Sequence, residues 1–240
     1  MAVKTLLPRG AKVRRTTGGA VLSIGLIASA STPVSAAGAV DTAQHTSTRV
    51  GGYVVRGGEH LARVSFVVPS IRCGADETGV ATSMVAYDRA GKLITGVGID
   101  ARCADSTAAY SVVIISGDFT DPVAEASAGD HVRITYRHRR DGLRMILHNR
   151  TRGDRTGYLD PGAQVQAGTI EIGARPSALR GMTALPLAQF DAFPMRRPSV
   201  DREPPDAADA TTLVDEDGTP QVRPSPPKSR RANFVLHRVD

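Results

Sequence analysis

Three absences limit what this chain can be. It has no tryptophan, only two cysteines, and no apolar run long enough for a membrane helix. The apolar stretch at residues 20–30 covers about eleven positions and is broken by Gly25, whereas a spanning helix needs about 20 residues. No segment repeats apolar residues at helical spacing, which argues against an α-helical fold. Two cysteines without a cluster of histidines give no metal site, and we expect neither a metal nor a cofactor.

Basic charge is concentrated at the N-terminus. The formal charge of the chain is +6, and residues 1–37 hold five basic side chains and no acid. This basic start, the apolar stretch and the small-x-small motif Val34-Ser35-Ala36 predict a secretory signal peptide over residues 1–37. We therefore expect a secreted, extracellular protein with no membrane span after cleavage. Arg14-Arg15 is a weak twin-arginine signal because Thr-Thr-Gly follows, so the sequence does not separate the two export routes.

Export bears on the two cysteines, Cys73 and Cys103. An oxidising compartment allows two thiols to form a disulfide, and a reducing one does not. Closing this loop of about 31 residues would stabilise the fold by roughly 3 to 4 kcal/mol in the chain-entropy model. The alternative is a pair of buried free thiols.

Short extended segments separated by turns dominate the middle of the chain. Residues 61–68 alternate apolar and polar side chains until Pro69, as a half-buried strand does. Residues 132–136 and 143–147 also alternate, and Asp141-Gly142 between them predicts a hairpin turn. Further strands are expected at 82–87, 92–99, 110–115, 169–173 and 187–193. Many short strands with turn signals predict an all-β, antiparallel sandwich or barrel.

Composition divides the mature chain into three parts. Residues 38–48 are small and polar and predict a flexible arm, and residues 49–195 contain the strands of the expected domain. Eight of the fifteen prolines lie from Pro194 onward, among equal numbers of acids and bases, which predicts a disordered tail over residues 196–240. Phe234-Val235-Leu236 is a lone apolar triplet there, interpreted as part of a loose terminus, although it could instead dock on the domain or on a partner.

A colinear set of short motifs resembles the bacterial eqolisins, the glutamic peptidases. The order and spacing match over residues 51–194. The matching pieces are Gly52-Tyr53, 64–69, Cys73, Thr95-Gly96, Cys103, Tyr110, 128–130, 149–151, Pro176-Ser177 and 185–190. The resemblance implies a concanavalin-like sandwich of two packed antiparallel sheets with a substrate groove on the concave face. It also implies an acid-active endopeptidase, in which a glutamate activates water and a glutamine stabilises the oxyanion.

The residues that the family uses for catalysis are missing at the matching positions. The family glutamine falls on Ile94, and anchoring on Pro176-Ser177 places the family glutamate on Ile170. An isoleucine neither accepts a proton nor donates a hydrogen bond, so no catalytic residue is predicted. Glu171 is the one alternative, provided that a β-bulge turns it onto the groove face. The residues expected to line the groove are Met84, Ile94, Val113, Ile115, Ile170 and Ile172.

Other charged and nucleophilic patterns are weaker. His131, His138 and His148 lie on or near the hairpin without a recognisable nucleophile motif, so we interpret them as surface residues. Arg137, Arg139 and Arg140 at its tip could bind an anionic polymer, although a solvated turn is the simpler interpretation. Asn149-Arg150-Thr151 is a glycosylation sequon, but its place in the family pattern marks a strand end.

Three hypotheses about function follow. The leading one is a secreted, non-catalytic eqolisin-like pseudoenzyme, a monomer that binds a peptide or a polysaccharide in its groove or serves as a scaffold. The second is a divergent glutamic endopeptidase that uses Glu171, and the third is an anion-binding surface protein that uses Arg137, Arg139 and Arg140. No nucleic-acid partner is expected, because no aromatic residues are interleaved with the basic ones.

Overall fold

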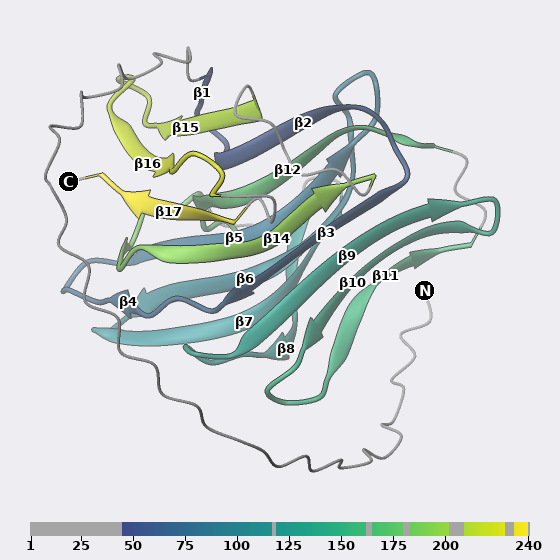
Figure 1. The fold of residues 1–240 in the computed structure, drawn as a ribbon. Helices are drawn as coiled ribbons and strands as arrows, with labels where there is room; N and C mark the ends of the chain where they lie inside the picture. The colour runs from purple at the N-terminus through teal and green to yellow at the C-terminus, as the bar shows by residue number, and fades with distance from the viewer. Residues whose placement is uncertain are drawn as a thin grey trace, which may run out of the picture. The chain divides into compact units, whose positions relative to one another are not determined.

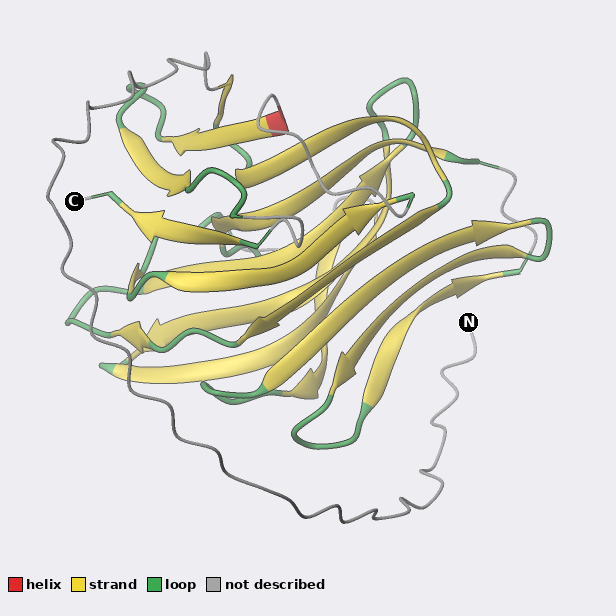
Figure 2. Ribbon diagram, viewed as in Figure 1, coloured by secondary structure: helices red, strands yellow, loops and turns green. Residues whose placement is uncertain are grey.

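Strands make up almost all of the regular structure. The computed structural model describes residues 45–116, 119–161, 165–179, 183–201, 209–228 and 233–239, which belong to one compact unit, Thr42–Asp240. Within these ranges there are seventeen strands and no α-helix; the short red segment before β15 in Figure 2 is a 3₁₀ turn at Asp209. The strands pair antiparallel, except that β1 and β15 pair in parallel. The predicted all-β, antiparallel fold is confirmed.

Seventeen strands follow one another along the described part of the chain. In chain order they are β1 (His45–Ser47), β2 (Gly51–Glu59), β3 (Leu61–Val67), β4 (Ile71–Arg72), β5 (Thr78–Tyr87), β6 (Leu93–Ala104), β7 (Thr107–Ser116), β8 (Phe119–Glu125), β9 (His131–Arg139), β10 (Gly142–Asn149), β11 (Arg155–Asp160), β12 (Ala167–Pro176), β13 (Gln189–Phe190), β14 (Phe193–Val200), β15 (Ala210–Val214), β16 (Pro220–Pro224) and β17 (Phe234–Arg238). Fifteen of them form one large sheet, and β4 and β13 form a separate pair.

The large sheet folds over on itself to make the two layers of a sandwich. One layer has the order β11-β10-β9-β3-β14, the other has β2-β12-β5-β6-β7-β8, and β17, β16 and β15 connect them (Figure 1). At the open side, Cα atoms of β10 and β11 come within 8 Å of those of β6. The predicted sandwich is therefore present, with its layers formed as two parts of one continuous sheet.

Side chains from both layers meet in one main core, defined here as the large buried apolar cluster. The first layer contributes the alternating residues Val64 and Phe66 of β3 and Ile134 of β9. The second contributes Met84 and Ile172, among others. Period-two alternation in the sequence correctly identified β3, β9 and β10 of the first layer, because one face of each is buried and the other is not.

The β9–β10 hairpin forms as expected, with a shifted turn. Register pairs run from Asn149↔Val132 to Gly142↔Arg139, which places Arg140 and Asp141 in the two-residue turn. The sequence predicted Asp141-Gly142 there. Gly142 is instead the first residue of β10. Its φ of 112° is a conformation that glycine adopts readily, so the glycine is needed directly after the turn and not within it.

The C-terminal part of the chain is built into the sandwich. β14 continues to Val200, and β15, β16 and β17 complete the large sheet. Leu213, Val222, Phe234 and Leu236 are buried in the main core, with Phe234 only 1% exposed. The Phe234 ring lies 4.5 Å from that of Tyr53, measured between centroids. The predicted disordered tail over 196–240, including the loose apolar triplet, is therefore wrong for the described residues 196–201, 209–228 and 233–239.

The physical reason for this error is the placement of the prolines. Pro220 and Pro224 are the first and last residues of β16, and Pro198 lies at a register shift between Arg196 and Ser199 in β14. Proline is tolerated at strand ends and bulges, because no ladder hydrogen bond from its nitrogen is needed there. The high proline content of this region is therefore compatible with β15, β16 and β17, each of which contributes one or two apolar side chains to the main core.

The N-terminal predictions fall mostly outside the described residues. This holds for the signal peptide at 1–37 and for residues 38–44 of the expected arm. Residues 45–47 of that arm form β1, which pairs with Thr211–Leu213 of β15. In the part of the chain that the structure describes, no helix has the length and apolar character needed to cross a membrane.

Cys73 and Cys103 form a disulfide, which confirms that prediction. Cys73 follows β4, and Cys103 lies in β6, where it is buried in the main core. The bond ties the small β4–β13 pair to the second layer of the sandwich.

Removing this disulfide should lower stability without changing the fold. We expect the Cys73→Ser/Cys103→Ser double variant to lose roughly 3 to 4 kcal/mol of unfolding free energy, because the unfolded chain regains the entropy of an open loop. Chemical denaturation of the variant and of the native protein measures the difference. Two alkylatable thiols in native, unreduced protein would contradict the bond itself.

Candidate functional site

Strand β12 positions the only acid that the sequence offered as a catalytic candidate. It lies between β2 and β5, and its pairing with β5 runs from Thr169↔Tyr87 to Pro176↔Val80 without a register shift. Alternation along this stretch turns Ile170 and Ile172 into the main core, where both have no exposed surface. Glu171 therefore points to the opposite side, the outer side of the second layer.

A register shift does occur in β12, but it does not affect Glu171. It lies between Ala167 and Thr169, where Gly168 alone stands opposite two residues of β2, at positions 57 and 58. A Cβ at Gly168 would meet the backbone of Arg89 at 2.8 Å, so this position needs glycine for close packing. Since the shift precedes Thr169, the side on which Glu171 lies is fixed by the regular pairing up to Pro176.

Three side chains surround the Glu171 carboxylate, which is only 2% exposed. Its Oε2 atom accepts hydrogen bonds from the Tyr87 hydroxyl at 3.2 Å and from Arg175 Nη2 at 2.9 Å. Its Oε1 atom is 3.7 Å from Nη2 of Arg49, whose guanidinium also lies 5.2 Å from the centre of the Tyr87 ring. A buried carboxylate needs such partners, because an unpaired charge in a dry environment is strongly unfavourable.

Apolar side chains form the surroundings of this carboxylate. Val85, the register partner of Glu171, packs with Tyr87 and Ile115 in a second, smaller core on the outer side, and Leu93 packs against them. Gly96 allows this packing, because a Cβ there would approach Val85 Cγ2 to 2.9 Å. Glu171, Tyr87, Arg175 and Arg49 therefore form a charge-paired cluster that is surrounded by apolar side chains.

A second buried carboxylate lies on the same side of this layer. Asp100 is the register partner of Ala81, which in turn pairs with Arg175 of β12. It accepts hydrogen bonds from Ser177 Oγ at 2.5 Å and from Arg102 Nε at 2.7 Å. The sequence predicted Glu171, but neither cluster as a whole. The even spacing of Glu171 and Arg175 was the available signal, since it places both side chains on one side of a strand.

The positions matched to the family's catalytic pair do not meet at this cluster. Ile94 is partly buried and packs against the main core, and Ile170 lies within that core. The preceding residue, Leu93, packs against the second core instead. A register shift between Ala86 and Tyr87 occurs opposite these two residues.

The six residues expected to line a groove are divided between the two sides of the layer. Met84, Ile170 and Ile172 are buried in the main core, against which Ile94 also packs. Ile115 belongs to the second core, and Val113 lies on the same side as Ile115, two residues before it. They therefore do not form one continuous surface.

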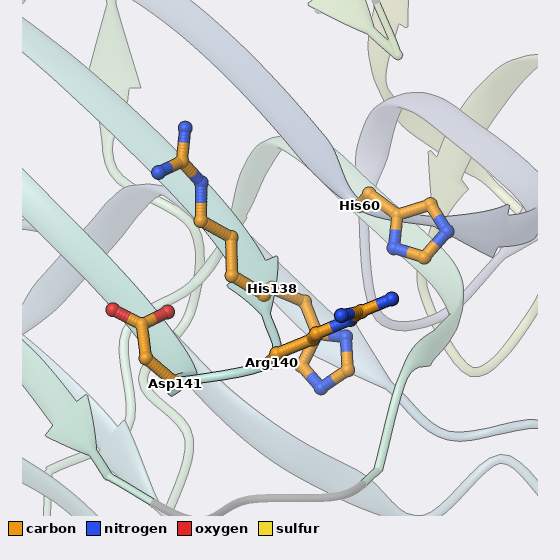
Figure 3. Close-up of a pocket in the computed structure, with 5 residues that line it drawn as sticks. His60, His138, Arg140 and Asp141 are labelled. Atoms are coloured by element: carbon orange, nitrogen blue, oxygen red, sulfur yellow. The ribbon is translucent and has the colours of Figure 1, made fainter.

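The basic hairpin tip borders an open hollow. Its volume is about 640 Å³, and it is lined by His60, His138, Arg139, Arg140 and Asp141 (Figure 3). The His60 and His138 rings stack at 6.2 Å between centroids, and Asp141 is engaged by Arg144 at 3.1 Å. Arg137 lies outside this hollow, in β9 opposite Arg144.

The three histidines of the hairpin are not brought together. His138 lies at the tip opposite Leu143, His148 lies opposite Arg133, and His131 pairs with Val67 of β3. The part of the chain that the structure describes also contains no group of three His, Cys, Asp or Glu side chains able to hold a metal ion.

Asn149 of the glycosylation sequon is a structural residue. It ends β10 and is 1% exposed. Its Nδ2 donates to Asp130 at 2.7 Å, and its Oδ1 accepts from the backbone of Thr151 and Arg152. The amide that would carry a glycan is therefore buried and engaged, as expected for a residue at a strand end.

Comparisons with known proteins find similar structures but no match by sequence. No family model and no curated protein matches the chain. Scytalido-glutamic peptidase with a transition state analog inhibitor superposes with a TM-score of 0.63 at 17% identity, over 80% of this chain and 98% of that one. SCP-B, a member of the eqolisin family of peptidases in complex with the tripeptide Ala-Ile-His, gives 0.60 at 13% identity, over 80% and 98%. Aspergilloglutamic peptidase from Aspergillus niger gives 0.56 at 14% identity, over 68% and 99%.

At these identities the similarity shows the fold alone. The sandwich of this chain has the architecture seen in the glutamic peptidases, as the sequence motifs predicted.

Proposed function

We propose that this chain is a secreted, non-catalytic protein that uses the glutamic-peptidase fold to bind a ligand or to act as a scaffold. One observation carries the proposal: the position matched to the family glutamate is Ile170, buried in the main core, while Glu171 beside it is fully engaged by Tyr87, Arg175 and Arg49. Signal-peptide features at residues 1–37 support secretion.

The chemistry of peptide hydrolysis favours a non-catalytic protein over a peptidase. A glutamic peptidase needs a carboxylate that can take a proton from water and a donor that stabilises the oxyanion. In this chain Oε2 of Glu171 already accepts two hydrogen bonds, and Oε1 faces a guanidinium. The position matched to the family glutamine, Ile94, offers no donor. Losing one oxyanion donor alone costs about 100- to 1,000-fold in rate, and this chain lacks the family's second catalytic group as well.

A peptide is the ligand class that the comparisons favour. SCP-B was solved with a bound tripeptide, and scytalido-glutamic peptidase with a peptide-based transition state analog. A chain with the same architecture and without the catalytic pair would retain a surface for extended peptides while leaving them intact.

Catalysis through Glu171 is the second candidate. Its support is that Glu171 faces away from the main core, with the Tyr87 hydroxyl as a neighbouring hydrogen-bond donor. Arg49, the group nearest Oε1, has a side chain that is 64% exposed, so this contact is the easiest of the three to open. Anion binding by Arg137, Arg139 and Arg140 is the third candidate. Its support is the hollow at the hairpin tip, which Arg139 and Arg140 line and where Arg144 pairs with the carboxylate of Asp141; Arg137 lies outside the hollow.

A peptidase assay separates the first two candidates. Purified protein should leave unfolded protein substrates intact between about pH 2 and 5, where the glutamic peptidases would be expected to work. Mass spectrometry of the substrate measures this. Cleavage that the Glu171→Gln substitution abolishes, in a variant whose circular dichroism spectrum is unchanged, would replace the non-catalytic proposal by the Glu171 mechanism. Binding of unfolded peptides without cleavage is the expected result.

A further inference from the structure

The first layer of the sandwich carries a band of arginines on its outer face, meaning the side of β14, β3, β9, β10 and β11 turned away from the main core. These strands lie side by side (Figure 1). Arginines project from this face or from the turns beside it, at positions 63, 133, 150, 155, 196 and 197. None of the six forms an ion pair with any residue that the structure describes.

Five of the outer-face residues form a straight row across the strands. Register pairs connect Arg196 with Ser65, Ser65 with Arg133, Arg133 with His148, and His148 with Arg155. We call this set the arginine row. Neighbouring strands are about 4.8 Å apart, so the three arginines, which lie on every second strand, repeat at about 10 Å. Ser65 and His148 stand between them as smaller polar groups.

The charges in and around the row repel one another. Burial, followed by the nearby Arg150, Arg63 and Arg197, lowers the pKa of Arg133 below its ordinary value. Burial, followed by Arg155, Arg150 and Arg133, likewise lowers the pKa of His148. Such uncompensated positive charge is unfavourable for the folded chain by itself, and a bound anion would relieve it.

One end of the row opens into a hollow of about 390 Å³. Arg196, Arg197 and Lys228 supply positive charge there, and Pro194 and Val235 supply apolar surface. Cations next to an apolar wall suit an acidic sugar, which has a charged group on one edge and C–H surface on its faces.

We infer that the arginine row binds a linear anionic polysaccharide that runs across the strands, with its acidic groups at Arg196, Arg133 and Arg155. An extended chain with one acidic group on every second sugar has a repeat close to that of the arginines, and the intervening sugar would face Ser65 or His148. Single-stranded nucleic acid fits less well, because no Phe, Tyr or Trp of the described strands projects from this face to stack on bases.

Binding of hyaluronan fragments to the full-length chain tests the inference, because hyaluronan carries one carboxylate per disaccharide. The Arg133→Gln/Arg155→Gln/Arg196→Gln variant should bind roughly 10- to 100-fold more weakly than the native chain in calorimetry at low salt. The control variant Arg56→Gln/Arg89→Gln/Lys92→Gln removes the same charge from exposed side chains of the other layer, and it should bind as the native chain does. Neutral dextran should not bind.

A second readout uses the native protein alone and does not depend on how the variants fold. The groups around His148 are Arg133 on β9, Arg155 on β11 and Arg150 in the turn after β10, all of them cationic. A polyanion on the row should offset their charge, so the pKa of His148 should rise on addition of hyaluronan fragments, as followed by NMR titration. An unchanged titration of His148 would overturn the inference.

Three further outcomes would also overturn it. Equal loss of binding in both triple variants would show attraction by net charge alone. Tighter binding to single-stranded DNA, or to vesicles containing phosphatidylglycerol, would show that the face recognises a different class of partner. Undiminished hyaluronan binding by the Arg133, Arg155 and Arg196 variant would place any anion site elsewhere, such as the hollow at the hairpin tip.

Discussion

A chain truncated after Met195 is expected to lose its cooperative unfolding transition. The deletion removes β15, β16 and β17, which connect the two layers of the sandwich. It also removes most of β14 from the first layer. It also removes Leu213, Val222, Phe234 and Leu236 from the main core. Burial of each such side chain is worth about 1.5 to 3 kcal/mol, and a whole domain is stable by only about 5 to 15 kcal/mol.

Circular dichroism and thermal melting of the truncated chain measure this effect. A single substitution provides a milder version: Phe234→Ala should cost about 3 to 5 kcal/mol, because it leaves a cavity beside Tyr53. The neighbouring Val235→Ala is the control and should cost less, since Val235 is only partly buried. A truncated chain that melts within a few degrees of the intact protein would show that the C-terminal strands contribute little to the core.

The strands that could be predicted from the sequence are those expected at 82–87, 92–99, 110–115 and 169–173, which overlap β5, β6, β7 and β12, and those with long, regular alternation. Residues 61–68 and the 132–147 hairpin placed their apolar side chains on one face, and β3, β9 and β10 follow that pattern. β15, β16 and β17 have only five residues each, with one or two core side chains apiece. Their burial depends on strands far away in sequence, such as Tyr53 in β2 opposite Ala210, so no local pattern reveals it.

The sequence identified Glu171 of the candidate site, but neither its orientation nor its partners. Motif spacing identified Ile170 and Glu171 as the two positions of interest, yet it counts residues and does not say which side of a strand faces the core. Pairing with β2 and β5 decides this, because the side-chain period of a strand is two and a shift by one residue exchanges its two faces. The partners of Glu171 come from β5, β12 and the segment before β2, a combination that only the folded sheet brings together.

Restoring the family glutamate at the matched position, Ile170→Glu, should destabilise the protein severely. Ile170 has no exposed surface and packs in the main core among apolar side chains. Burying an unpaired carboxyl group costs several kcal/mol even when the group stays protonated. We expect a loss of at least about 4 kcal/mol in unfolding free energy, or a chain that does not fold at all.

Ile146→Glu makes the same chemical change at a surface position and is the matched control. Ile146 is 38% exposed on the outer face of β10, opposite Thr135 and Gly157 and diagonal to Arg133 and Arg155 of the arginine band. A carboxylate there stays hydrated and is attracted to these arginines, so stability should change by no more than about 0.5 kcal/mol. Urea denaturation of both variants and the native chain provides the comparison.

The outcome bears on function as well as on packing. If Ile170→Glu folds with near-native stability and cleaves unfolded substrates at low pH, position 170 faces an accessible groove, and the motif alignment correctly locates the catalytic site. If it unfolds while Ile146→Glu does not, the side of β12 that carries Ile170 is closed to substrate. Any peptide chemistry or peptide binding on this strand would then have to occur on the opposite side, where Glu171 is held by Tyr87 and Arg175.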